Sequence, residues 1–206
     1  MTDSQKPRWV IASNNKKKLA ELQMLLGDKI ELSTLADHGI ESPEEDGLTF
    51  IENALIKARA AAEVTGLPSL ADDSGIVVPA LKGAPGLYSA RYAYEGATDP
   101  ENNQALIKAL QDAGLEYAQA HYHCTIVFLR HANDPDPIIA QGHWQGRVYT
   151  KEQGEGGFGY DPMFYLAPDF TTTSAQIPAT EKAAISHRGI AIREFQKKLA
   201  QFEADL

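Results

Sequence analysis

Short apolar runs alternate with helical stripes along this chain, and that alternation restricts the fold more than any other feature. The apolar run at residues 8–12 is too short for a helix and is followed at once by the polar residues 13–15. Leucines then recur at three- and four-residue spacing through residues 16–26, with Gly27 where a left-handed cap would end a helix. The start of the chain therefore predicts a strand, a polar turn and a helix.

Three further helices are predicted. Thr49 and Glu52 have capping-box spacing and open a helix that ends at Gly66. Its apolar stripe, with Asn53 and Lys57 expected on the opposite face, is Ile51, Leu55, Ala58 and Ala62. Thr98 or Asp99 begins a third helix, which runs to Gly114. The last helix is indicated by a C-terminal stripe of Ile192, Phe195, Leu199 and Phe202.

The remaining apolar runs predict strands. Residues 67–71 predict a strand that enters a sharp polar turn at residues 72–75, after which residues 76–78 resume extended structure. The longer runs 121–129 and 138–149 flank a connection rich in Asn, Asp and Pro, which predicts an antiparallel hairpin. Strands interleaved with helices, plus one hairpin, predict an α/β chain with a mixed sheet.

Composition excludes several classes of protein. A length of 206 residues with 43% hydrophobic residues suits one globular domain over residues 1–206. The net charge of -9 argues against a nucleic-acid partner, which would need a strongly basic face. One cysteine, Cys124, rules out an internal disulfide, and no apolar run suits a signal peptide or membrane span. We therefore expect a cytoplasmic protein with no membrane partner.

The first candidate site is the polar and cationic segment at the start of the first predicted helix. Its residues are Ser13, Asn14, Asn15, Lys16, Lys17 and Lys18. Amides at a helix N-terminus point toward whatever lies there, so the segment suits a phosphate, although it lacks the glycines of a P-loop. The alternative is a capped helix with solvated lysines.

The second candidate site is rich in carboxylates. Glu41, Glu44, Glu45 and Asp46 precede the second helix, and Asp72 and Asp73 follow a buried strand. Mg²⁺ binds through one or two carboxylates and shares its remaining positions with water and phosphate oxygens. The alternative for the first group is a solvated acidic run that favours the helix N-terminus.

The third and fourth candidates lie near the C-terminus. Residues 154–162 hold four glycines with two aromatic residues, which suits close backbone approach and a stacking face for a planar base. Lys182, His187 and Arg188 supply donors and positive charge just before the last predicted helix, where helix capping is the alternative role. His121 and His123 share one face of a strand, where a packed pair is favoured over a metal site.

Six motifs in order along nearly the whole chain resemble the inosine triphosphate pyrophosphatase family. They are residues 13–18, the segment 47–54 with Lys57, residues 71–75, residues 83–86 through 89–92, residues 157–162 and residues 186–188. The resemblance implies an elongated mixed β-sheet flanked by helices, two lobes with a central cleft, and a homodimer. It also implies Mg²⁺-dependent cleavage of ITP, dITP and XTP between the α and β phosphates, giving the monophosphate and pyrophosphate.

The resemblance also implies a role for each matching residue. Asp73 would be the general base and, with Glu44 or Glu45, would hold the metal. The residues expected at the triphosphate are Ser13, Asn14, Asn15, Lys16, Lys17, Lys18, Lys57 and Ser74. Phe158, with Gly159 and Tyr160 beside it, would stack on the base, whose edge would meet Asp161, Lys182, His187 and Arg188.

Two positions depart from the family pattern, and two other functions remain open. The family commonly has glycine at the position of Asn14 and often at that of Lys17, so this loop is bulkier and more charged. Asn tolerates a left-handed backbone, which makes the first change mild. The alternatives are a pyrophosphatase for modified pyrimidine or other nucleotides, and a nucleotide-binding regulatory module without a working base.

Overall fold

The computed structural model describes residues 6–204, with only the backbone given for Asp28 and residues 202–204. Expectations about residues 1–5 and about the side chain of Phe202 lie outside this description. The strands are β1 (Arg8–Ile11), β2 (Glu31–Thr34), β3 (Ser69–Val77), β4 (Tyr117–Leu129), β5 (Ile138–Tyr149) and β6 (Phe164–Leu166). The α-helices are α1 (Lys16–Leu26), α2 (Phe50–Thr65), α3 (Asp99–Asp112), α4 (Ala179–Ile185) and α5 (His187–Ala204).

The strands pair in the order β2-β1-β3-β4-β5-β6. Strand β1 is parallel to β2 and β3, whereas β5 and β6 are antiparallel. Strands β4 and β5 are neighbours joined by residues 130–137, which confirms that the two long apolar runs pair. The predicted α/β fold with a mixed sheet is therefore confirmed.

The chain divides into two compact units, which agrees with the two lobes that the family resemblance implies. The first unit takes in the chain up to Asp73, residues 124–142 and the chain from Ala191 on. The second unit takes in residues 74–123 and 143–190. The chain passes between the units within β3, β4 and α5 and just after Gly142 in β5.

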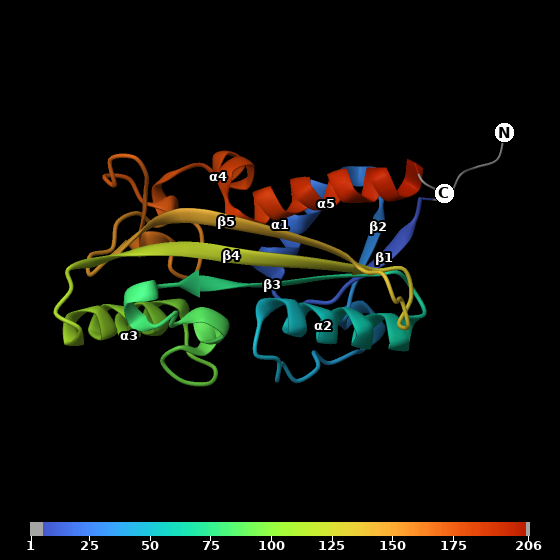
Figure 1. Cartoon of the computed structure of the whole chain (residues 1–206), viewed down its shortest axis with the longest axis horizontal. Coiled ribbons are helices and arrows are strands. Elements are labelled where there is room, and N and C mark those ends of the chain that lie inside the picture. Colours follow the sequence, from blue (N-terminus) through green and yellow to red (C-terminus); the bar gives the residue numbers. More distant parts are fainter. Residues whose placement is uncertain (1–5, 205–206) are drawn as a thin grey trace. The chain divides into compact units, whose positions relative to one another are not determined.

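The first unit has helices on both faces of its strands (Figure 1). Trp9, Ile11 and Phe128 point to one face, where they pack with Leu22 of α1 and Phe195 of α5. The alternate strand residues point to the other face, where alanines of α2 cover them: Val10, Ala12, Ala71, Val127 and Leu129 against Ala54, Ala58 and Ala61. Because strand side chains alternate, a strand covered on both faces must be apolar throughout, as residues 9–12 are.

The second unit has a core of its own. Leu106 and Leu110 of α3 pack with Tyr122 of β4, Trp144 of β5 and Phe164 of β6. The aromatic residues pack closely, with the rings of Tyr122 and Phe164 tilted by 58° and their centroids 4.7 Å apart. This core lies directly under the glycine-rich loop, because Tyr160 and Met163 are part of the same cluster.

Helix boundaries follow the predicted signals. The Thr49 hydroxyl accepts from Glu52 N at 3.2 Å, and Gly66 ends α2 in the left-handed conformation. Thr98 and Glu101 form the capping box that opens α3. Gly27 follows α1 with φ 71° and ψ -166°, a backbone region that favours glycine but is not the expected left-handed cap.

Three local predictions were wrong. Residues 72–75 form no turn, because β3 continues through them as one strand from Ser69 to Val77. Asn53 and Lys57, which were expected opposite the apolar stripe of α2, are buried together with Ala58 and Ala62 of that stripe. Helix α5 begins at His187, so His187 and Arg188 lie in its first turn rather than before it. In the first two cases the reason is an ion pair between a lysine and a buried aspartate, Lys18 with Asp72 and Lys57 with Asp73.

Candidate functional site

The first unit gathers lysines and carboxylates from three separate segments. Lys57 of α2 donates to Asp73 Oδ1 of β3 at 2.8 Å, and its Nζ lies 3.3 Å from Glu45 Oε1. Lys18 of α1 lies 3.3 Å from Asp72 Oδ2. We call these five residues, Lys18, Glu45, Lys57, Asp72 and Asp73, the lysine–carboxylate cluster. Charges can be buried in this way because each has an opposite charge in contact.

Local structure places each member of the cluster. Lys18 and Lys57 lie on helices covering opposite faces of β3, and the consecutive residues Asp72 and Asp73 point to opposite faces, so each meets one lysine. Glu45 is held by the segment before α2, where Gly47 N donates to Asn53 Oδ1 at 2.8 Å. A Cβ on Gly47 would come within 2.6 Å of that oxygen, so this close approach requires glycine.

Burial and charge act on the protonation of the cluster in opposite directions. Burial raises the pKa of the Asp73 carboxyl above its usual value, although Lys57 and Lys18 pull it down. Burial alone would lower the pKa of Lys57, but Asp73, Asp72 and Glu45 outweigh it and raise the pKa. Lys57 therefore stays charged, and Asp73 is a carboxylate with increased basicity.

The polar segment at the start of α1 is arranged as a helix cap. The Asn15 side chain accepts from Lys17 N at 3.1 Å and Lys18 N at 3.2 Å, and Ser13 Oγ accepts from Asn15 N. Of the three consecutive lysines, Lys18 contacts Asp72 of the lysine–carboxylate cluster, while Lys16 and Lys17 are exposed. Asn14 is exposed too, and its Nδ2 lies 3.4 Å from Ser42 Oγ. The side-chain cap therefore takes up the amides of Lys17 and Lys18, and the positive end of the helix dipole stays at this terminus.

The two glutamates proposed as metal ligands differ in their surroundings. Glu44 is exposed, whereas the side chain of Glu45 is 29% exposed and contacts Lys57. Among residues 6–204, no group of three or more His, Cys, Asp or Glu side chains is arranged to hold a metal ion. Of the two glutamates, Glu45 is the one that contacts the Lys57 ammonium, which also contacts Asp73.

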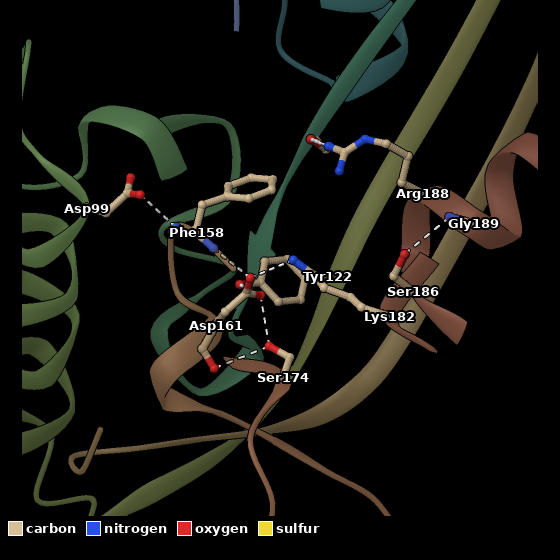
Figure 2. Close-up of polar contacts among 11 residues, drawn as sticks. Asp99, Tyr122, Phe158, Asp161, Ser174, Lys182, Ser186, Arg188 and Gly189 are labelled. Carbon is tan, nitrogen blue, oxygen red and sulfur yellow. Dashed lines mark hydrogen bonds and ion pairs between the residues drawn. The ribbon is translucent and has the colours of Figure 1, made fainter. Parts of the chain in front are cut away.

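The second unit holds the glycine-rich loop, and Asp161 is the centre of its contacts (Figure 2). Asp161 Oδ2 accepts from Phe158 N at 2.8 Å and from Lys182 Nζ at 2.5 Å. Asp161 Oδ1 accepts from Ser174 Oγ at 2.8 Å. The side chain is only 2% exposed, so these donors keep a buried carboxylate satisfied.

Phe158 lies beside a cation. Lys182 Nζ is 4.5 Å from the centre of the Phe158 ring, within the range of a cation–π contact. The loop is fixed further by Tyr160, whose hydroxyl donates to Ser89 O at 2.7 Å. The Gly159 amide donates to Asp99 Oδ2 at 2.9 Å, and Figure 2 shows Asp99 directed toward the loop at this point. The ring is therefore attached to a backbone held on several sides.

His187 and Arg188 extend the same region from the first turn of α5. The His187 ring stacks on Tyr122, with centroids 4.6 Å apart and planes 11° from parallel. Arg188 is 1% exposed, and its Nη2 donates to Ser74 Oγ at 3.1 Å. We call Phe158, Asp161, Lys182, His187 and Arg188 the base-side cluster. All of them lie in the second unit, as does Ser74.

Sequence reasoning missed several residues that complete these clusters. The sequence assigned no separate role to Asp72. Its ion pair with Lys18 could not be predicted, because it depends on how β3 lies against α1. Tyr122, Ser174 and Asp99 support the glycine-rich loop from distant parts of the chain. Asp99 had been accounted for by its place at a helix start, so nothing in the sequence pointed from it to Gly159.

The two histidines of β4 were expected to pack as a pair, and the structure packs both of them against His143 of β5. His123 Nδ1 lies 2.8 Å from His143 Nε2 of β5, and the His121 ring centroid is 5.5 Å from that of His143. Burial first, then His143 and His121, lower the pKa of His123 to about 4. His123 is therefore uncharged near neutral pH, and its ring is within hydrogen-bond distance of the His143 ring.

Comparison with known proteins gives one consistent result. A model of the Ham1 family matches residues 9–198 of the chain. The dITP/XTP pyrophosphatase of Shigella flexneri is 51% identical over 185 residues, which cover 89% of this chain and 93% of that protein. The dITP/XTP pyrophosphatase of Escherichia coli K12 is 49% identical with the same coverage. A HAM1 protein structure from Coxiella burnetii superposes with a TM-score of 0.87 at 44% identity, covering 95% of this chain and 99% of that one.

The fold and the two clusters define the class of protein to which the chain belongs. It is an α/β protein with a mixed sheet, and its buried lysines, arginine and carboxylates suit a phosphorylated ligand. Within that class, the chain belongs to the Ham1 family. The resemblance drawn from the six motifs is thereby confirmed. Among residues 6–204, no helix has the length and apolar character needed to cross a membrane.

Proposed function

We propose that this chain is a nucleoside triphosphate pyrophosphatase that hydrolyses the non-canonical purine nucleotides ITP, dITP and XTP to monophosphate and pyrophosphate. Family membership supports the proposal, as do two relatives near 50% identity that are named dITP/XTP pyrophosphatases. The single observation that carries it is the buried Asp73 carboxylate, which has a raised pKa and contacts Lys57 at 2.8 Å. Such a group accepts a proton more readily than an exposed aspartate does.

Asp73 would act as the general base. Its carboxylate takes a proton from the attacking water while the water oxygen bonds to phosphorus and the α–β phosphoanhydride bond breaks. The products are the nucleoside monophosphate and pyrophosphate, and the proton on Asp73 returns to solvent. Lys57 holds Asp73 in its ionised form and orients it through the 2.8 Å hydrogen bond. Positioning and charge neutralisation are the main requirements of phosphoryl chemistry.

The other residues of the first unit would bind the triphosphate. Lys18 is half-buried beside Asp72, and the positive end of the α1 dipole lies at the terminus that Asn15 caps. Ser13, Asn14, Lys16 and Lys17 surround that terminus in sequence, and Ser74 follows Asp73 directly. We propose that these side chains supply donors and positive charge to the phosphates.

Mg²⁺ would be held by Asp73 and Glu45. Their carboxylates share the Lys57 ammonium, so the position already accommodates a cation between hard oxygen donors. Mg²⁺ takes one or two protein carboxylates and completes its shell with water and phosphate oxygens, so a group of three protein ligands is not required. When bound, the ion would neutralise charge on the phosphates and lower the pKa of water. Glu44 is the less suitable ligand because it is exposed.

The base-side cluster would recognise the purine. Phe158 offers a stacking face, with Gly159 and Tyr160 fixing the loop, and Lys182, His187 and Arg188 supply donors for a 6-oxo group. Adenine carries an amino group at that position, which would leave those donors unpaired. Asp161 would act on the base through Phe158 and Lys182, both of which donate to it.

A substrate panel tests the proposal. The purified chain is incubated with Mg²⁺ and separately with ITP, dITP, XTP, ATP, GTP and a modified pyrimidine triphosphate, and pyrophosphate release is measured. We expect the three non-canonical purines to be cleaved with kcat/KM at least tenfold above the others. Equal cleavage across the panel, or preference for the pyrimidine, would contradict the proposal.

The Asp73→Asn variant separates an enzyme from a regulatory module. Asn keeps an oxygen that can accept from Lys57 but is a far weaker base, so turnover should fall by about 10²–10⁴-fold while ITP binding largely persists. ITP binding is measured by calorimetry on the same preparation. Unchanged turnover in this variant would exclude Asp73 as the base.

Two further properties belong to the proposal. We propose a homodimer, which light scattering of the purified chain would test; a monomer at micromolar concentration would contradict it.

We also propose a cytoplasmic location, which suits an enzyme that acts on the nucleotide pool and which fractionation of the source cells would test.

A further inference from the structure

The loop that carries Phe158 is held by two carboxylates from different parts of the second unit. The Phe158 amide donates to Asp161 Oδ2 at 2.8 Å, and the next amide, that of Gly159, donates to Asp99 Oδ2 at 2.9 Å. Asp161 belongs to the loop itself, whereas Asp99 lies 60 residues away. Figure 2 shows Asp99 and Asp161 on opposite sides of the Phe158 backbone.

The position of Asp99 suits this contact. It is the first residue of α3, directly after the Thr98 cap, where the helix dipole stabilises a negative charge. A hydrogen bond from a backbone amide to a carboxylate is about twice as strong as one between neutral groups. Gly159 has φ 61° and no atom within 4 Å of where its Cβ would be, so this residue is free to turn its amide toward α3.

We propose that Asp99 is a positioning residue for recognition of the base: by holding the Gly159 amide, it sets the direction of the Phe158 ring. The inference rests on the proposed function, in which Phe158 stacks on the purine. This role requires no contact between Asp99 and the substrate. Asp99 acts only through the loop, so its effect should depend on the presence of a base and of the Phe158 ring.

A ligand without a base separates this role from a general one. Inorganic tripolyphosphate carries the phosphates alone, so its inhibition constant reports on the phosphate end. In Asp99→Ala we expect KM for ITP to rise roughly 5- to 20-fold, since one stacked base is worth that order of affinity. We expect kcat to stay within about twofold and the tripolyphosphate inhibition constant to stay unchanged. An equal rise in that constant would overturn the proposal.

A double-variant cycle tests whether Asp99 acts through the ring. Once Phe158→Leu has removed the stacking face, adding Asp99→Ala should change KM by less than about twofold. Additive effects of the two substitutions would overturn the proposal. Asp99→Asn keeps an oxygen acceptor for Gly159 N and should restore most of the affinity.

Glu101→Gln is the matched control, because Glu101 caps the same helix through Thr98 and does not contact Gly159. Its KM for ITP should match that of the wild type. Hydrogen exchange supplies a readout that does not depend on turnover: the Gly159 amide should exchange faster in Asp99→Ala and not in Glu101→Gln. Unchanged exchange in Asp99→Ala would overturn the proposal, whereas a wild-type chain that leaves ITP intact would instead contradict the proposed function.

Discussion

Lys57 and Asp73 form a buried ion pair, with Nζ 2.8 Å from Oδ1 and both side chains less than 10% exposed. The pair joins α2 to the central strand β3, and Glu45 contacts the same ammonium. Burial works against both charges, so neither would be stable there without its partner. Because Lys57 acts on the pKa of Asp73, replacing Lys57 should change the pH at which Asp73 ionises.

Replacing Lys57 should move the acid limb of the pH–rate profile. Lys57 lowers the pKa of Asp73, which burial has raised. In Lys57→Met that attraction is lost, so the pKa of Asp73 rises further and a higher pH is needed to ionise the base. We expect the acid limb of kcat/KM for ITP to move to higher pH, together with a lower maximal rate.

Lys29→Met is the control for this profile, because Lys29 is an exposed lysine outside the cluster. Its acid limb should coincide with that of the wild type. A Lys57→Met limb at the same pH as the wild type would mean that Asp73 does not control the rate.

Adding a methyl group at Gly157 should disrupt the glycine-rich loop. Gly157 has φ 72°, and a Cβ there would overlap Asp161 Oδ2, which holds the Phe158 amide. In Gly157→Ala we expect KM for ITP to rise about tenfold or more, because the stacking face is displaced. Steady-state kinetics with ITP measure this.

Gly114→Ala provides a matched comparison within the same unit. Gly114 also has φ 72° but has nothing within 4 Å of a Cβ, so it carries the backbone strain without the clash. This variant should lose about 1 kcal/mol of stability and keep the wild-type KM. Similar kinetics for the two variants would show that strain, rather than the contact with Asp161, is responsible.

The histidine group should make stability depend on pH. The pKa of His123 is about 4 in the folded chain, below its ordinary value of 6.5, so the unfolded chain binds more protons between these values. Stability should therefore fall as the pH drops from about 6.5 toward 4. Because the group is part-exposed, we expect the loss to be about 1 kcal/mol.

Urea unfolding at pH 7 and pH 5 measures this loss. His123→Gln should show a smaller difference between the two pH values than the wild type does. The control is His131→Gln, since His131 is exposed in the connection after β4. An identical pH dependence in wild type and His123→Gln would refute the assignment.

Asp134 should be important for the β4–β5 connection. Its side chain is 1% exposed and accepts from Arg130 N at 2.9 Å, Arg130 Nε at 2.7 Å and Asp136 N at 3.1 Å. Asp134→Ala removes the acceptor that these three donors share and should cost about 2 kcal/mol of unfolding free energy. Asp136→Ala, an exposed aspartate in the same connection, should cost less than about 0.5 kcal/mol. Equal losses for the two variants would contradict this role.

Local signals in the sequence were enough to predict most elements. The bounds of α1, the caps of α2 and α3 and the range of β5 follow from spacing, capping residues and glycines, which act within a few residues of themselves. The ordered motifs were enough to place the chain in its family, because six short patterns in one order rarely coincide by chance. They also named Asp73, Lys57 and Phe158, which the structure places in two well-formed clusters.

Tertiary structure decided what each of those residues contacts. Asp72 and Asp73 look like a turn in sequence, yet β3 continues through them because Lys18 and Lys57 on opposite faces compensate their charges. Three consecutive lysines look alike in sequence, but the structure pairs Lys18 with the buried Asp72 and leaves Lys16 and Lys17 exposed. The contact from Asp99 to Gly159 spans 60 residues and leaves no periodic trace. Periodicity and capping report on neighbours along the chain, whereas the pairing of buried charges depends on which helix covers which face of a strand.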